Sequence, residues 1–134
     1  MKVIDFATAK NIAEKLKIRK WNECQYLYAK DTKELIGWWS IKADYYLKDD
    51  NRFYPAPFIQ EVIEYIEDFS EYRIYITPRF DGFDNAQIDT YFEIYKNGVA
   101  GGKDYSSDAH VGNKYESANR AINEVIDLIL NNEK

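Results

Sequence analysis

Apolar residues recur at helical spacing in three segments of the chain. In the first, residues 7–18, they lie on one helix face and comprise Ala9, Ile12, Ala13 and Leu16. Asp5 or Thr8 can cap this segment, because either side-chain oxygen can accept an amide hydrogen from the first turn. The pattern predicts an amphipathic helix near the start of the chain.

The other two helical segments begin near Pro57 and at Asn113. Pro57 stands near the first helical position, where the N–H that proline lacks would have no partner anyway. The apolar stripe of this helix contains Phe58, Ile59, Val62, Ile63, Ile66 and Phe69. Asn113 and Glu116 have the spacing of a capping box. The helix that follows ends near 131–132, and its stripe contains Ala118, Ala121, Ile122, Val125 and Ile129.

Between the first two helices the pattern changes to that of strands. Residues 24–29 and 35–41 flank the polar segment 30–34 and predict a hairpin. Residues 42–55 are charged and predict irregular structure.

After the second helix, the segment 72–77 predicts a strand whose pairing Pro78 limits. In 91–99 alternation runs into Asn97-Gly98, the pair best suited to a type I′ hairpin turn. A bulge is expected in the return strand at 101–102, where two glycines stand. Three tyrosines are expected to serve the strands structurally: Tyr72, Tyr91 and Tyr95.

These elements predict an α+β fold in the order α-ββ-α-β-ββ-α. Four to five mainly antiparallel strands would form a small sheet packed by three helices. At 134 residues, with no segment that reads as a linker, residues 1–134 are expected to form a single domain.

Composition places this domain among cytoplasmic proteins. Hydrophobic residues make up 46% of the chain, yet no apolar run is long enough to span a bilayer and the first ten residues do not resemble a secretory signal. Cys24 is the only cysteine, so no internal disulfide can form. We therefore expect a cytoplasmic location and no membrane partner.

Charge is unevenly distributed along the chain, whose net charge is −5. Residues 1–60 carry eleven basic and eight acidic side chains, whereas 61–93 carry two basic and nine acidic ones. Direct nucleic-acid binding is disfavoured, because attraction to phosphates needs clustered Lys and Arg. The acidic segment is either a solvated helix face with a loop, or a surface for a basic partner formed by Glu61, Glu64, Glu67 and Asp68.

Residues with catalytic or metal-binding chemistry are scarce. His110 is the only histidine and lies in a segment rich in Gly, Ser and Asp, while Cys24 lies within a predicted strand, where a buried thiol serves packing. One Cys and one His cannot fill a zinc site, and Phe83 occupies the third position of a calcium loop read from Asp81. We predict no catalytic residue, no metal and no cofactor.

Aromatic residues are the best candidates for a binding surface in this sequence. The chain has twelve tyrosines and three tryptophans, and one group gathers around the first hairpin: Tyr26, Tyr28, Trp38, Trp39, Tyr45 and Tyr46. Aromatic side chains dominate the energetics of protein interfaces. This group is therefore the predicted aromatic surface, with burial in the core as the alternative.

From Trp21 onward the chain resembles a family of short α+β proteins from gut bacteria and their phages. The resemblance rests on five segments: 24–29, 52–57, 72–76, 91–95 and 115–122. Acidic residues and isoleucines stand in the second helix where the family has basic residues and leucines. The family has no assigned activity, so the resemblance implies a mobile-element or accessory role and transfers no catalytic residue.

The leading hypothesis is a non-enzymatic, protein-binding accessory module of phage or prophage origin. One version is an acidic decoy that occupies the nucleic-acid site of a host protein. The alternatives are a small enzyme using carboxylates and tyrosines, and a ligand-sensing domain with an aromatic pocket. Homo-oligomerisation and the identity of the partner are left open.

Overall fold

The computed structural model describes residues 2–21, 24–37, 52–80, 87–96, 103–107 and 114–132. The chain divides into two compact units: unit 1 is residues 1–59 and unit 2 is residues 60–134. Compactness does not decide whether the units fold together, so the single domain remains a prediction.

Unit 1 begins with a helix that changes its winding halfway. Helix α1 (Phe6–Asn11) continues into the π-helical segment η1 (Ile12–Leu16). Asp5, not Thr8, caps it: the Asp5 carboxylate accepts a hydrogen bond from the Thr8 N–H at 2.8 Å. Lys17, at φ 62°, lies in the left-handed region and ends the helix before the predicted position 18.

The sheet of unit 1 is antiparallel and has the order β2-β1-β3 among the described residues. Strands β1 (Tyr26–Ala29) and β2 (Leu35–Gly37) form the predicted hairpin, with β1 starting two residues later than expected. Strand β3 (Phe53–Pro55) corrects the prediction of irregular structure for the end of 42–55. Its proline fits there because β3 has one described neighbour, and an edge strand tolerates a missing N–H.

The start of the chain is tied to the segment before the next helix. Val3 forms an antiparallel bridge with Phe58, and the Ile4 N–H donates to the Pro57 carbonyl at 3.1 Å. The core of this unit holds one face of the first helix together with residues from the segment before it, from β1 and from the β3 segment: Ile4, Ala9, Ile12, Ala13, Leu27, Tyr54 and Ala56.

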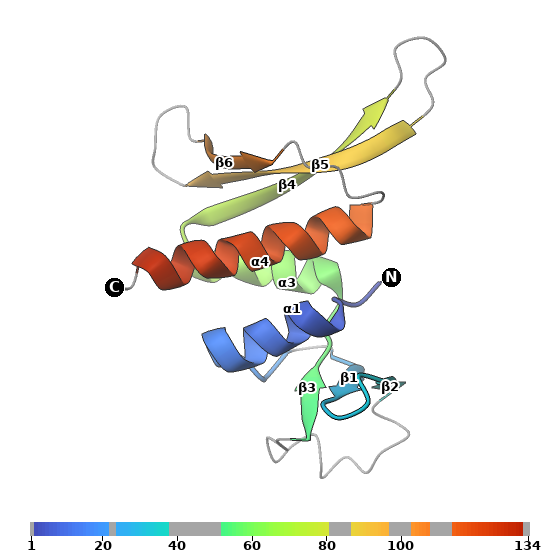
Figure 1. Cartoon of the computed structure of the whole chain (residues 1–134). Coiled ribbons are helices and arrows are strands. Elements are labelled where there is room, and N and C mark those ends of the chain that lie inside the picture. Colours follow the sequence, from blue (N-terminus) through green and yellow to red (C-terminus); the bar gives the residue numbers. More distant parts are fainter. Residues whose placement is uncertain are drawn as a thin grey trace. The chain divides into compact units, whose positions relative to one another are not determined.

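Unit 2 contains a second antiparallel sheet, with the order β4-β5-β6 among the described residues. Its strands are β4 (Tyr72–Phe80), β5 (Gln87–Lys96) and β6 (Lys103–Ser107). Helix α4 (Lys114–Asn132) packs on β4 and β5 and runs along one side of the sheet (Figure 1).

Strand β4 is longer than the sequence predicted. It passes Pro78, which pairs in register with Thr90, and continues to Phe80. Strand β4 has one described neighbour, β5. The missing N–H of Pro78 is tolerated there because an edge strand pairs on one side only. The register of β5 with β6 shifts between Ile94 and Tyr95. This shift is close to the bulge predicted at 101–102. Residues 101–102 and the predicted turn at Asn97-Gly98 lie outside the described residues.

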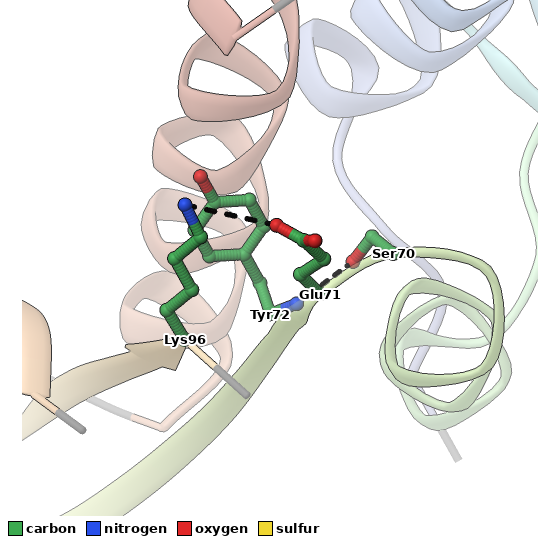
Figure 2. Close-up of polar contacts among 4 residues, drawn as sticks. All are labelled: Ser70, Glu71, Tyr72 and Lys96. Carbon is green, nitrogen blue, oxygen red and sulfur yellow. Dashed lines mark hydrogen bonds and ion pairs between the residues drawn. The ribbon is translucent and has the colours of Figure 1, made fainter. Parts of the chain in front are cut away.

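Helix α3 (Ile59–Phe69) leads into β4 through a short polar turn. The Ser70 hydroxyl donates to the Ile66 carbonyl at 2.6 Å and accepts from the Tyr72 N–H at 3.2 Å. Figure 2 shows Lys96, at the end of β5, pointing toward Glu71, and the two charged groups are 3.7 Å apart. The turn thereby links the helix end to the paired ends of β4 and β5.

The predicted helix stripes are largely confirmed. In α3, Ile59, Val62, Ile63 and Ile66 are buried, and α4 buries every predicted stripe residue and Ile126 as well. Leu16 and Phe58 are only partly buried, and Phe58 lies before the start of α3. Phe69 departs furthest from the prediction: it is 45% exposed and its ring centroid lies 4.8 Å from that of Tyr65. The prediction that Phe69 extends the buried stripe is wrong, and the buried stripe of α3 ends at Ile66.

The fold class is confirmed as α+β, with antiparallel strands packed by helices. Among the described residues the strands are divided between two three-stranded sheets, and three helical segments accompany them. Within the described part of the chain, no helix combines the length and apolar character needed to cross a membrane.

Candidate functional site

The two described members of the predicted aromatic surface, Tyr26 and Tyr28, make contacts within unit 1. Tyr28 donates its hydroxyl hydrogen to the Ile4 carbonyl at 2.7 Å, and its ring meets that of Phe6 edge to face at 5.7 Å. Tyr26 lies two residues earlier on β1 and makes a similar contact with Phe58 at 6.3 Å. Both side chains are half-buried. The other four members lie outside the described residues: Trp38, Trp39, Tyr45 and Tyr46. The aromatic surface therefore remains a prediction.

All four residues of the predicted acidic surface belong to helix α3. Glu64 and Asp68 are exposed, whereas Glu61 and Glu67 are partly exposed. The Gln60 amide donates to the Glu64 carboxylate at 3.3 Å, a contact one helical turn long. Whether these carboxylates meet a partner remains a prediction.

The residues considered for catalysis and metal binding gain little support as a site. Cys24 is buried and its thiol donates to the Tyr26 carbonyl at 3.2 Å, as expected of a packing residue. His110 lies outside the described residues. Across the described ranges, no group of three or more His, Cys, Asp or Glu side chains is placed to hold a metal ion.

The sheet of unit 2 has one covered face, which positions the candidate site on the other. Successive side chains of a strand point to opposite faces, and the covered face buries Tyr72, Ile74, Phe92 and Ile94. A hydrogen bond between the buried Thr90 and Ser117 hydroxyls joins β5 to α4 on this side. Tyr72 is thus structural, as predicted.

The opposite face carries Arg73, Tyr75, Glu93 and Tyr95, and we call these four residues the open face. In the ladder, Arg73 pairs with Tyr95 and Tyr75 pairs with Glu93. Arg73 and Tyr75 are exposed, Tyr75 by 48%, while Glu93 and Tyr95 are partly exposed. The register therefore gathers two tyrosines and two opposite charges on one side of β4 and β5.

The two rings of the open face are packed against each other. The ring centroids of Tyr75 and Tyr95 are 5.3 Å apart, with the ring planes at 86°. The Tyr95 hydroxyl donates to the Glu93 carboxylate, which orients that ring and leaves Tyr75 the more exposed of the pair. The two packed rings thus form an aromatic surface beside the Arg73 cation and the Glu93 anion. Such a surface can make both apolar and polar contacts.

Sequence reasoning missed this face. Tyr95 was expected to be structural, but it lies on the side away from α4; the side chain of Tyr91 is outside the described part. The signal was present in the alternation of β4, where Arg73 and Tyr75 alternate with Tyr72, Ile74 and Ile76. It was not decisive, because the same alternation would arise if a further layer covered that side.

A second cluster lies in unit 1, where Tyr54 of β3 meets Glu14 of η1. The Tyr54 hydroxyl donates to the Glu14 carboxylate at 2.5 Å. Burial, and then this hydrogen bond, raise the pKa of Tyr54 to about 12. The same bond, assisted by the charges of Lys10, Lys30 and Lys17, lowers the pKa of Glu14. Burial is also the main cause that raises the pKa of Tyr28.

Comparisons with protein-family models, with curated proteins and with solved structures found no match for this chain.

Proposed function

We propose that this chain is a non-enzymatic protein-binding module whose contact surface is the open face of unit 2. One observation carries the proposal: Tyr75 is 48% exposed while its ring is held edge to face against Tyr95. A partly fixed aromatic ring loses little conformational entropy on binding, and Tyr and Arg are enriched at the energetic centres of protein interfaces. Glu93 and Arg73 supply the polar contacts that would fix the orientation of the partner.

The setting proposed for this module comes from the sequence. The resemblance to proteins of gut bacteria and their phages supports an accessory role on a mobile element. The single cysteine, Cys24, supports a cytoplasmic location, because a reducing compartment makes no use of disulfides.

A second candidate is the acidic decoy, in which α3 contacts a basic host protein. The exposed ring pair of Tyr65 and Phe69 supports it, because this pair shares the helix with Glu61, Glu64 and Asp68. An interface with an aromatic centre and a charged rim has this composition. The two candidates use different elements of unit 2, so variants can distinguish them.

Affinity capture from a lysate of the source cells, quantified by mass spectrometry, tests the proposal. The bait is the full chain, compared with Tyr75→Ala and with the matched control Tyr115→Ala, an exposed tyrosine on α4. We expect a saturable partner that the control retains and that Tyr75→Ala loses by about tenfold or more, as for a hot-spot residue.

The proposal fails if no saturable partner is found or if Tyr75→Ala retains it as well as the control does. Loss on the double change Glu64→Lys and Asp68→Lys, with Tyr75→Ala unaffected, would favour the acidic decoy instead.

A further inference from the structure

Unit 1 is basic although the chain as a whole is acidic. Residues 1–59 contain eleven basic and eight acidic side chains, a net charge of +3, whereas residues 60–134 contain seven and fifteen, a net charge of −8. Part of this positive charge is concentrated around two neighbouring rings, those of the buried Tyr54 in β3 and the partly buried Phe6 in α1, in contacts that the structure describes.

Two lysines from the β1–β2 turn lie over those rings. The Lys30 ammonium is 4.9 Å from the ring centroid of Tyr54, and the Lys33 ammonium is 5.5 Å from that of Phe6. The two rings are themselves packed edge to face, with centroids 5.7 Å apart. Each cation is therefore held by attraction to a ring, and the two rings are neighbours.

The first helix and the segment that follows it contribute further cations near Glu14 and Tyr54. The charges of Lys10 and Lys17 act together with that of Lys30 on the Glu14 carboxylate. The Arg19 guanidinium donates to the Phe53 carbonyl at 2.8 Å, and its charge acts on Tyr54. We call the four lysines the lysine face: Lys10, Lys17, Lys30 and Lys33.

Among the described residues near the lysine face, two acidic groups are engaged and two are exposed. Glu14 accepts the Tyr54 hydroxyl hydrogen, and Asp5 caps α1 while its charge acts on Tyr28. Asp31 and Glu34 stand in the β1–β2 turn and are exposed. Glu14 shows that a carboxylate is stabilised at this place, because the Tyr54 hydroxyl and the charges of the lysines both favour its ionised form.

We propose that the lysine face binds an acidic segment of a partner protein, with Glu14 as an internal competitor for the same cations. Carboxylates of such a segment would meet lysines that the fold has already gathered, so less side-chain entropy is lost on binding. The lysine face belongs to unit 1, and its use does not depend on that of the open face.

A peptide fits this surface better than a nucleic acid does. The Tyr54 ring is only 4% exposed, so it presents no face on which a base could stack. Nucleic-acid binding also needs a continuous basic track, and the net charge of −8 on residues 60–134 opposes a long polyanion. A short run of glutamates requires only the lysines at the cluster.

Fluorescence anisotropy with a labelled twelve-residue peptide of alternating Glu and Ser tests the proposal in low-salt buffer. We expect saturable binding that Lys30→Glu with Lys33→Glu weakens by about tenfold or more, since close charge pairs across interfaces couple strongly. The matched control is Lys15→Glu with Lys20→Glu, an equal change in net charge at exposed lysines of unit 1, which should change the affinity by about twofold or less. Glu14→Gln should strengthen binding, because it removes the competing charge and keeps an acceptor for Tyr54.

Three results would overturn the proposal. These are no binding by the wild-type chain, equal weakening by the control pair, and unchanged or weaker binding by Glu14→Gln. Tighter binding of a labelled twelve-nucleotide thymidine strand than of the peptide would assign the surface to nucleic acid and would equally reject it. Circular dichroism and thermal unfolding of each variant establish that the fold is retained.

Discussion

Units 1 and 2 each contain a three-stranded antiparallel sheet among the described residues, but they use tyrosine differently. In unit 1, Tyr54 is 4% exposed and Tyr28 is half-buried, and both hydroxyls have partners more than twenty residues away in the sequence. In unit 2, Tyr75 is 48% exposed on the side of the sheet away from α4. Tyrosine therefore anchors the packing of the first sheet, whereas the second sheet, which also buries Tyr72, leaves the ring of Tyr75 exposed. What differs is whether another element covers the face on which the ring lies.

Truncation of one tyrosine from each sheet gives the largest expected contrast. Tyr54→Ala should lower the free energy of unfolding by about 3–5 kcal/mol, the range for deleting a large buried ring. Tyr75→Ala should change it by about 0.5 kcal/mol or less, because exposed positions rarely affect stability. Urea unfolding followed by circular dichroism measures both. A comparable loss of unfolding free energy for the two variants would show that the distinction between the buried Tyr54 and the exposed Tyr75 is wrong.

Alkaline pH should weaken the contribution of Tyr54 to stability. The folded-state pKa of Tyr54 is about 12, against an ordinary value near 10, so its neutral hydroxyl stabilises the fold fully below pH 10. This contribution should be lost as the pH rises from 10 toward 12. At the acid end, the lowered pKa of Glu14 means that the same hydrogen bond weakens as the pH falls below the ordinary value of 4.5.

The measurement is the difference in unfolding free energy between the wild type and Tyr54→Phe across the pH range. Using the difference cancels the titration of other groups, including the lysines. We expect a plateau at neutral pH with decreases at both ends. A flat profile up to pH 12 would mean that the Tyr54–Glu14 bond does not contribute to stability.

The hydroxyl of Tyr28 should give the smallest of the three effects. Tyr28→Phe removes one hydrogen bond to the Ile4 carbonyl and keeps the ring contact with Phe6, so a loss of about 1 kcal/mol is expected. Tyr75→Phe is the matched control in the other sheet and should be neutral. If thermal unfolding shifts equally in both variants, the hydroxyl of Tyr28 has no special role.

Local periodicity predicted most of the secondary structure. The stripes of α3 and α4 followed from apolar spacing, and the cap of α1 is one of the two residues that the sequence left open, Asp5. The errors fall where a distant partner decides the outcome. Strand β3 is three residues long and forms because Leu27, Tyr28 and Ala29 pair with it, which its own composition does not reveal.

The candidate surfaces were less predictable than the elements. The acidic residues were found from charge alone, since all four lie on one helix. The open face was not, because alternation separates two sides of a strand without saying which side is covered. The lysine face was missed for another reason: its members come from α1, the segment after η1 and the β1–β2 turn, which are joined only by the fold.

By itself, the sequence determined the helices, the hairpins, the antiparallel α+β class and the scarcity of histidine and cysteine chemistry. These properties depend on residue type and on spacing over a few positions, which the chain carries locally. Only the tertiary structure decided that Tyr54 reaches Glu14 across forty positions, that α4 covers one side of the second sheet, and that Tyr75 remains on the other. Those outcomes depend on which surfaces exclude water from each other, and burial of that kind is a property of the packed chain.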